Sequence, residues 1–225
     1  MSRIRFAAVA AALLGSACQA PQAPPSPESA QTAQTAPAAA APASQAPAAA
    51  TLDLGQYVKA DDTLLARKEF DLLGDGNPQT VLIVRHGGKD ASQMYPCQLL
   101  ILRKDASAYA VAASSDKVVD CFFNEVAKNA KDLSDNLKLS RDSLVYVNQG
   151  EKSSTTYSFK YSAETSGWRL DRAESHYSVP SETSDDLDSY EETAAYPKDF
   201  ALISLADFDP ARIEDAMRAN KKKTP

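Results

Sequence analysis

The sequence has few of the residues that carry out most enzymatic chemistry. It holds 2 histidines, 1 tryptophan and 3 cysteines among 225 residues. It contains no G-x-S-x-G nucleophile motif, no phosphate-binding glycine loop and no C-x-x-C or H-x-x-x-H metal spacing. These absences argue against a serine hydrolase, a P-loop nucleotide-binding protein and a zinc protein. The sequence therefore predicts a protein that is not an enzyme and takes no cofactor.

Long apolar runs and basic clusters are also scarce. The longest apolar run at the N-terminus covers the nine residues 6–14, whereas a membrane-spanning helix needs about 20 residues. It follows Arg3 and Arg5 and precedes small residues, which is the pattern of a secretory signal peptide. The net charge of −6, with one basic cluster at residues 221–223, argues against nucleic acid as a partner.

The end of the apolar run, Leu14-Gly15-Ser16-Ala17-Cys18, resembles a bacterial lipobox, with the leucine one place earlier than usual. The resemblance implies that residues 1–17 are a removed signal peptide and that Cys18 is acylated and begins the mature chain. Gln19 then implies sorting to the outer membrane, facing the periplasm, with the membrane contacted through the lipid on Cys18. The alternative is an ordinary cleaved signal followed by an unmodified Cys18.

Residues 18–50 form a compositionally distinct segment after the signal. Residues 19–50 hold 14 alanines, 7 prolines and 5 glutamines, and no leucine, isoleucine, valine or aromatic residue. Such a segment cannot bury enough apolar surface to offset the entropy of ordering. We therefore expect a disordered linker that separates the lipid anchor from a single folded domain at residues 51–225.

The body is expected to be mainly β, an antiparallel meander of hairpins with about six to seven strands. Short apolar or alternating segments separated by turn residues predict these strands: 67–71, 80–85, 97–103, 109–113, 144–148, 156–161 and 168–177. One or two short helices are also expected. Apolar residues at near-helical spacing suggest one at about 122–133, and Asp209 followed by Pro210 predicts the start of another, with the lysines 221–223 at its C-terminus.

The acidic residues of the body are locally concentrated. Arg3, Arg5 and Glu28 are the only charged residues before residue 51, so the body carries a net charge of −7. Six carboxylates fall within residues 182–192, a segment without strand or helix periodicity that we expect to be a solvated surface loop. The alternative is a docking loop for a basic protein partner, formed by Asp185, Asp186, Asp188, Tyr190, Glu191 and Glu192.

The motif Asp71-Leu72-Leu73-Gly74-Asp75-Gly76-Asn77 resembles the calcium-carrying turn of FG-GAP/VCBS-type repeats. The resemblance implies a weak metal site at Asp71 and Asp75, which match the first and fifth loop positions. Leu73 offers no side-chain oxygen at the third, and calcium prefers six to eight oxygen ligands. We therefore favour the interpretation that the motif is a tight turn between two strands. The wider pattern of the body is similar to uncharacterised bacterial secreted β domains, which supports the fold class only.

Two cysteines remain in the body once Cys18 is assigned to the lipid. In the periplasm Cys97 and Cys121 would lie in an oxidising compartment, so a disulfide between them is the favoured prediction. Two separate buried thiols are the alternative.

These features favour an outer-membrane lipoprotein that acts as a non-enzymatic protein-binding module in the periplasm. One concrete form is an immunity protein that neutralises a basic antibacterial effector, because an acidic surface would steer such a partner. The second hypothesis is an envelope-maintenance enzyme or a cell-wall-binding lipoprotein. The absence of a catalytic constellation favours the first.

Overall fold

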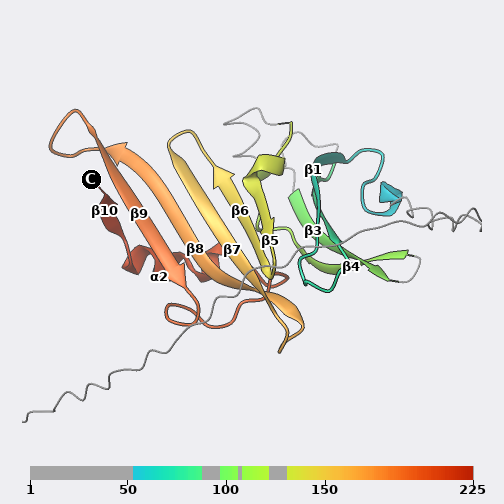
Figure 1. Cartoon of the computed structure of the whole chain (residues 1–225). Coiled ribbons are helices and arrows are strands. Elements are labelled where there is room, and N and C mark those ends of the chain that lie inside the picture. The colour runs from blue at the N-terminus through green and yellow to red at the C-terminus, as the bar shows by residue number, and fades with distance from the viewer. Residues whose placement is uncertain (1–52, 88–96, 106–107, 122–130, 225) are drawn as a thin grey trace, which may run out of the picture. The chain divides into compact units, whose positions relative to one another are not determined.

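The computed structural model describes residues 53–87, 97–105, 108–121 and 131–224, all within one compact unit of residues 48–225. Its first four strands form an antiparallel sheet in chain order (Figure 1). These strands are β1 (Thr63–Phe70), β2 (Gln79–Arg85), β3 (Cys97–Asp105) and β4 (Ala108–Ser115). A short 3-10 helix, η1 (Leu54–Gln56), precedes them.

The remaining six strands form a second antiparallel sheet in the order β10-β9-β8-β7-β6-β5. They are β5 (Leu137–Ser140), β6 (Ser143–Gln149), β7 (Ser153–Ser162), β8 (Gly167–Pro180), β9 (Leu187–Ala195) and β10 (Lys222–Thr224). The 3-10 helix η2 (Ser134–Asn136) precedes β5, and η3 (Pro210–Arg212) with helix α2 (Glu214–Ala219) lies between β9 and β10.

The prediction of a mainly antiparallel β fold is confirmed, including the hairpins β3–β4 and β7–β8. The strands divide between two sheets, and three of them had no counterpart in the sequence prediction. β5 and β10 have only four and three residues, and β9 is polar from Asp188 to Thr193. Hydrophobic periodicity does not reveal strands of these kinds.

Strands β2 and β3 lie at the centre of the first sheet and are buried on both faces, which explains their unbroken apolar sequences. On one face Val81, Ile83 and Leu99 join the main core. On the other face a smaller cluster forms from Leu82, Val84, Leu100 and Leu102, with Leu54, Tyr57, Val58, Leu64 and Tyr109 packed against it. The segment around η1 therefore covers the second face of this sheet.

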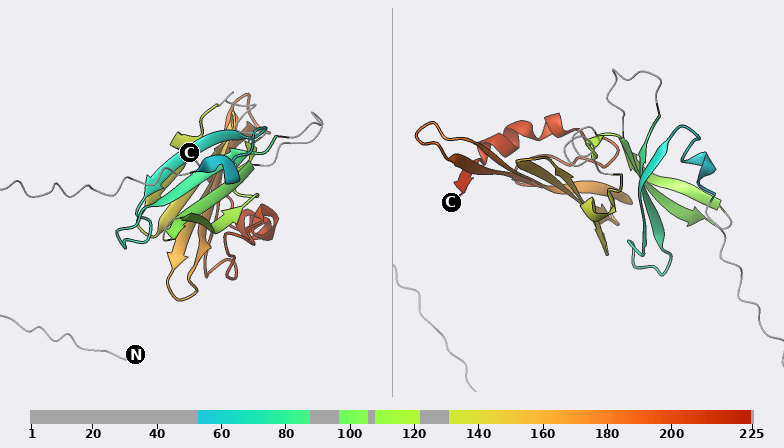
Figure 2. Two further views of the ribbon diagram at one scale, coloured as in Figure 1. Left: turned by 90° about the vertical axis from the view of Figure 1, so that its right-hand side faces the viewer. Right: turned by 90° about the horizontal axis from the view of Figure 1, so that it is seen from above.

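The main core continues into the six-stranded sheet and the C-terminal segment. Phe208 packs edge-on against Tyr157 and Phe159, with ring centroids 4.7 and 5.4 Å away. Ile213 and Met217 belong to the same buried cluster. Helix α2 packs against β9, and Figure 2 shows it along one face of the six-stranded sheet.

The C-terminal helical segment begins where the sequence predicted. The carboxylate of Asp209 accepts a hydrogen bond from the amide of Ala211 at 2.9 Å, and Pro210 occupies the first position of η3. The predicted helix at about 122–133 falls largely outside the described residues, because residues 122–130 are not among them.

Two sequence predictions near the C-terminus are wrong. The acidic segment 182–192 is not one surface loop, because β9 begins at Leu187 and continues to Ala195. The lysines 221–223 do not form the last turn of a helix, because α2 ends at Ala219 and Lys222–Thr224 form β10. Each segment supplies the pairing partner of the other, and local sequence cannot show such a long-range pairing.

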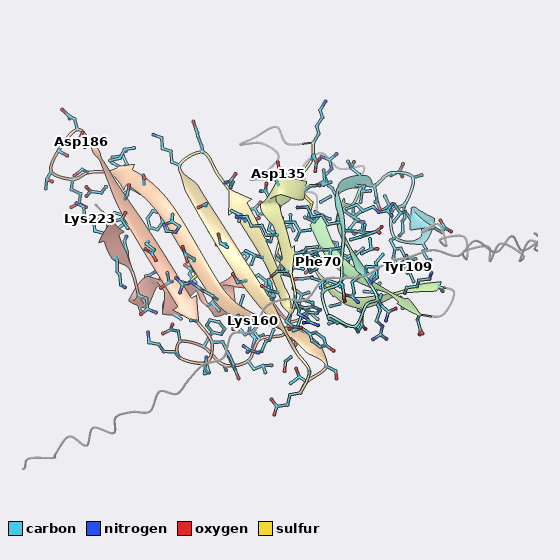
Figure 3. The ribbon with its side chains drawn as sticks, in the orientation of Figure 1. Phe70, Tyr109, Asp135, Lys160, Asp186 and Lys223 are labelled. Carbon is cyan, nitrogen blue, oxygen red and sulfur yellow. A yellow bond between two sulfur atoms is a disulfide. The ribbon has the colours of Figure 1, made fainter. Side chains whose placement is uncertain are left out.

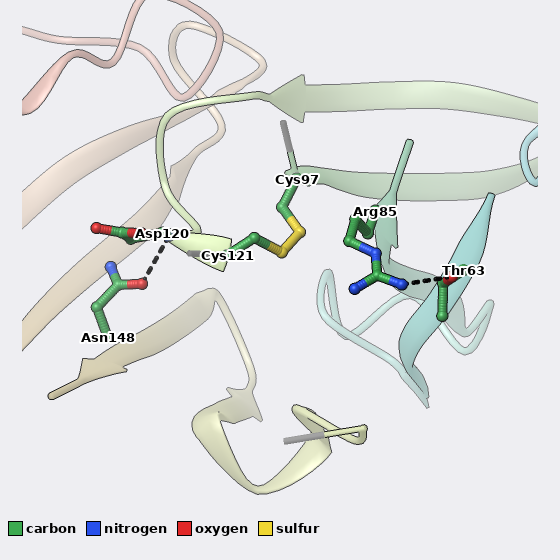
Figure 4. Close-up of a disulfide and its surroundings, with 6 residues drawn as sticks. All are labelled: Thr63, Arg85, Cys97, Asp120, Cys121 and Asn148. Carbon is green, nitrogen blue, oxygen red and sulfur yellow. Dashed lines mark hydrogen bonds between the residues drawn. A yellow bond between two sulfur atoms is a disulfide. The ribbon is translucent and has the colours of Figure 1, made fainter. Parts of the chain in front are cut away.

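The disulfide between Cys97 and Cys121 is confirmed, with Cα atoms 5.6 Å apart (Figure 4). It ties the start of β3 to the segment that follows β4. Asn148 on β6 holds the same segment, since its Oδ1 accepts a hydrogen bond from the amide of Asp120 and its Nδ2 donates to the carbonyl of Val118, both at 2.8 Å. The segment after β4 is therefore fixed covalently to one sheet and by hydrogen bonds to the other.

Candidate functional site

The acidic residues singled out in the sequence lie at the edge of the six-stranded sheet that holds β9 and β10. Asp185 and Asp186 lie in the turn between β8 and β9, and Figure 3 labels Asp186, the residue directly before β9. Asp188, Tyr190 and Glu192 alternate along β9 with Glu191, so they share one face of the sheet and Glu191 lies on the other. The six predicted residues therefore lie in three places. Asp185 and Asp186 are in the turn, Glu191 is on one face of β9, and the other face carries a row that we call the inner row: Asp188, Tyr190 and Glu192.

A tyrosine pair forms the centre of the inner row. Tyr177 on β8 and Tyr190 on β9 are directly opposite each other in the strand register. Their rings are stacked, with centroids 5.7 Å apart and an interplanar angle of 29°. The Tyr177 hydroxyl donates a hydrogen bond to Oε1 of Glu192 at 2.6 Å. Two aromatic faces and one carboxylate are therefore brought together on a single surface.

Lys221 occupies this aromatic surface. Its Nζ lies 3.9 Å from the ring centroid of Tyr190 and 5.1 Å from that of Tyr177. At such distances the negative face of each ring attracts the ammonium group. A hydrogen bond with Tyr177 and the nearby charge of Glu192 hold the pKa of Lys221 above its usual value.

A second lysine, Lys223, forms an ion pair with Asp188 of the inner row. Nζ of Lys223 lies 2.8 Å from Oδ1 of Asp188. This contact lowers the pKa of Asp188 and raises the pKa of Lys223. Lys221 and Lys223 are two residues apart next to an extended strand, so both face the inner row, whereas Lys222 pairs with Glu191 in the register.

The resulting site is an aromatic and acidic strand edge that holds two alternate lysines of this chain, Lys221 and Lys223. We name it the lysine-binding edge, formed by Tyr177, Asp188, Tyr190 and Glu192. Sequence reasoning found three of these residues but placed them in a loop, and it did not include Tyr177. The signal it missed was the alternation of lysines at residues 221 and 223, which matches the alternation of Asp188, Tyr190 and Glu192.

A shallow, open depression of about 270 Å³ adjoins the lysine-binding edge and includes Tyr177 and Tyr190 in its lining. Its lining is rich in hydroxyl groups and has no carboxylate: Lys152, Ser153, Ser154, His176, Tyr177, Ser178, Ser189, Tyr190 and Thr224. His176 at its wall is held by Oε1 of Glu174, 2.7 Å away. That hydrogen bond is the leading reason why the pKa of Glu174 lies below its usual range. This histidine is therefore fixed by a neighbouring carboxylate on the surface of the sheet.

The Gly-Asp-Gly turn uses its carboxylates to hold its own backbone. The two oxygens of Asp71 accept hydrogen bonds from the amides of Asp75 and Gly76 at 3.1 and 3.0 Å. Asp75 in turn accepts one from the amide of Asn77 at 2.9 Å. Among the described residues no group of three or more histidine, cysteine or acidic side chains is placed to hold a metal ion. These contacts agree with the favoured interpretation of a tight turn, and the weak metal site stays a prediction.

Cys18, the predicted lipidation site, lies outside the described residues, and its acylation stays a prediction. No helix in the described part of the chain is long and apolar enough to cross a membrane. Comparisons of the chain with protein-family models, with curated proteins and with solved structures found no match.

Proposed function

We propose that this chain is a lipoprotein anchored to the outer membrane through Cys18, whose β domain faces the periplasm and binds a protein partner without catalysing a reaction. The partner is basic, and one concrete form of the proposal is an immunity protein that neutralises a basic antibacterial effector. The domain does so by presenting an acidic and aromatic surface at the end of a linker.

The disulfide between Cys97 and Cys121 is the observation that supports the compartment most strongly. Stable disulfides belong to oxidising compartments such as the bacterial periplasm. This agrees with the charged start, the apolar run of nine residues and the lipobox-like sequence ending at Cys18. An acyl anchor attaches a domain to a membrane without any spanning helix.

The lysine-binding edge supports the binding role. It already binds two ammonium groups through Tyr190 and Asp188, in a domain whose net charge is −7. Complementary charge speeds the encounter of protein partners and disfavours partners of the same sign. The hydrogen-bond partners of the two histidines are carboxylates and an amide: Asp62 and Gln98 for His86, and Glu174 for His176.

Two measurements test the proposal. Cell fractionation of a Gram-negative host should place the wild-type chain in the outer membrane and the Cys18→Ser variant in the soluble or inner-membrane fraction. The mature chain mixed with periplasmic extract should elute from a sizing column with one basic protein in 1:1 ratio. Equal fractionation of the two forms would contradict the anchor, and turnover of peptidoglycan or an ester by the purified chain would contradict the non-enzymatic role.

A further inference from the structure

Strand β10 covers only part of the edge that β9 offers. β9 has nine residues and β10 has three, which pair with Ser189, Tyr190 and Glu191. Toward the C-terminal end of β9, Asn220 donates a hydrogen bond to the carbonyl of Thr193 at 3.0 Å. Toward the other end the strand pairing of the described residues stops at Ser189, and Leu187 is 49% exposed.

The contacts that hold β10 lie at the surface. None of its residues is buried, and none belongs to either apolar cluster. The core residues of the C-terminal segment, Phe208, Ile213 and Met217, all precede it. A strand that buries no side chain of its own can open locally while the rest of the domain stays folded.

We propose that β10 occupies the position at which a partner strand binds, and that an extended, lysine-bearing segment of a basic protein displaces β10 from the lysine-binding edge. This inference rests on the proposed function, since it names the partner's chemistry and the surface used. The occupant is identified by the chain's own lysines, which show the charge, the spacing and the extended conformation that the edge accepts.

The spacing gives the sequence preference of the edge. The ammonium over Tyr190 and Tyr177 comes from Lys221, the residue before β10, and the ammonium on Asp188 comes from Lys223, the second residue of β10. A lysine, any residue, then a lysine is therefore the pattern that fills both positions. The middle side chain points to the other face, where Lys222 pairs with Glu191, and it contributes little to the selection.

The C-terminal strand acts as an internal competitor in this arrangement. A tethered segment has an effective concentration on the order of millimolar at its own site. A partner strand must bind the edge more strongly than the tethered β10 does in order to displace it. Weakly basic chains would fail to do so, whereas partners that make further contacts would succeed. Removing the tail's two inward lysines should therefore open the edge to other ligands.

The test uses the mature chain and a fluorescent peptide of residues 219–225, followed by fluorescence anisotropy. The double variant Lys221→Gln/Lys223→Gln should bind this peptide at least ten-fold more tightly than wild type. The matched control is Lys222→Gln, which removes one charge from the same strand on the other face and should bind as wild type does. A peptide with glutamine in place of its first and third lysines should bind none of the proteins.

Equal peptide binding by wild type and the double variant would overturn the inference, as would equal binding of the glutamine peptide. A second measurement does not depend on the variants. Hydrogen exchange of the β10 amides in the wild-type chain should proceed through local opening, far faster than exchange in β7 and β8, and exchange only by global unfolding would also overturn it. Since both measurements use purified chain and synthetic peptide, a failed search for a natural partner would contradict the proposed function and leave this result intact.

Discussion

Asp62 and Gly87 are 25 residues apart in the chain, and Oδ1 of Asp62 accepts a hydrogen bond from the amide of Gly87 at 3.1 Å. The same carboxylate accepts one from the amide of Lys59 at 2.9 Å, and its Oδ2 lies 3.2 Å from Nδ1 of His86. One side chain therefore joins the segment before β1 to the end of β2. Burial alone would raise the pKa of Asp62, but these hydrogen bonds outweigh it and lower the pKa.

This arrangement predicts a stability change that depends on pH. Because the folded pKa is depressed, the ionised carboxylate stabilises the fold above the unfolded pKa of about 3.9, and the contribution is lost as pH falls through the folded value. Asp62→Ala should lower the free energy of unfolding by about 1–2 kcal/mol at pH 7, with the difference shrinking toward pH 2. Urea unfolding at both pH values measures this. Asp61→Ala, at an exposed neighbour, is the control and should match wild type at each pH.

A second prediction concerns Tyr146, which is fully buried and whose hydroxyl has no hydrogen-bond partner among the residues that the structure describes. A buried polar group without a partner costs free energy, so Tyr146→Phe should leave stability unchanged or raise it by about 1 kcal/mol. Tyr177→Phe is the contrasting variant, because it removes the 2.6 Å hydrogen bond to Glu192 and should not stabilise. Thermal unfolding of both variants decides the matter, and a clear loss of stability in Tyr146→Phe would refute the assignment.

The buried tyrosines also predict the behaviour of the fold in alkali. Burial raises the pKa of Tyr157 to about 12, with further increases from Asp120 and Asp209, and burial raises the pKa of Tyr146 as well. The unfolded chain releases these protons near pH 10, so stability should fall as pH rises above 10. Absorbance at 295 nm during a pH titration should show two tyrosines that ionise only with unfolding. Full ionisation of all tyrosines near pH 10 in a folded chain would contradict this.

The disulfide provides a prediction about stability under reducing conditions. Cys97 and Cys121 are separated by 24 positions, and closing a loop of that size contributes roughly 3 kcal/mol in the chain-entropy account. Cys97→Ala/Cys121→Ala should therefore unfold at a lower denaturant concentration than wild type by a corresponding amount. Wild type in excess reductant should approach the variant. Identical unfolding curves with and without reductant would show that the bridge contributes nothing.

The parts of the fold that the sequence revealed are those encoded by local chemistry. The unbroken apolar residues of β2 and β3, the hairpin turns, and Asp209 followed by Pro210 all have short-range physical causes. The strands β9 and β10 could not be found in this way. Their pairing depends on lysines at 221–223 meeting acidic and aromatic residues about 30 positions earlier, and neither segment has the hydrophobic alternation of a half-buried strand.

The same reason explains why the candidate site was only partly predicted. Asp188, Tyr190 and Glu192 were noticed because their segment is densely acidic. Their order along one face became evident only with the register of β9 against β8, which also brings in Tyr177. Asp188, expected to await a basic partner, is instead paired with the chain's own Lys223, so the free acidic surface is smaller than the composition suggests.

The most direct test of the account is a quantitative capture of periplasmic protein on the immobilised mature chain, compared between wild type, Lys221→Gln/Lys223→Gln and Tyr190→Ala. We expect one basic protein to account for most of the captured material. It should be most abundant on the double lysine variant, less abundant on wild type and least abundant on Tyr190→Ala, and added salt should reduce its binding to each chain. Equal capture by the three chains, or retention of peptidoglycan fragments in place of protein, would contradict the account.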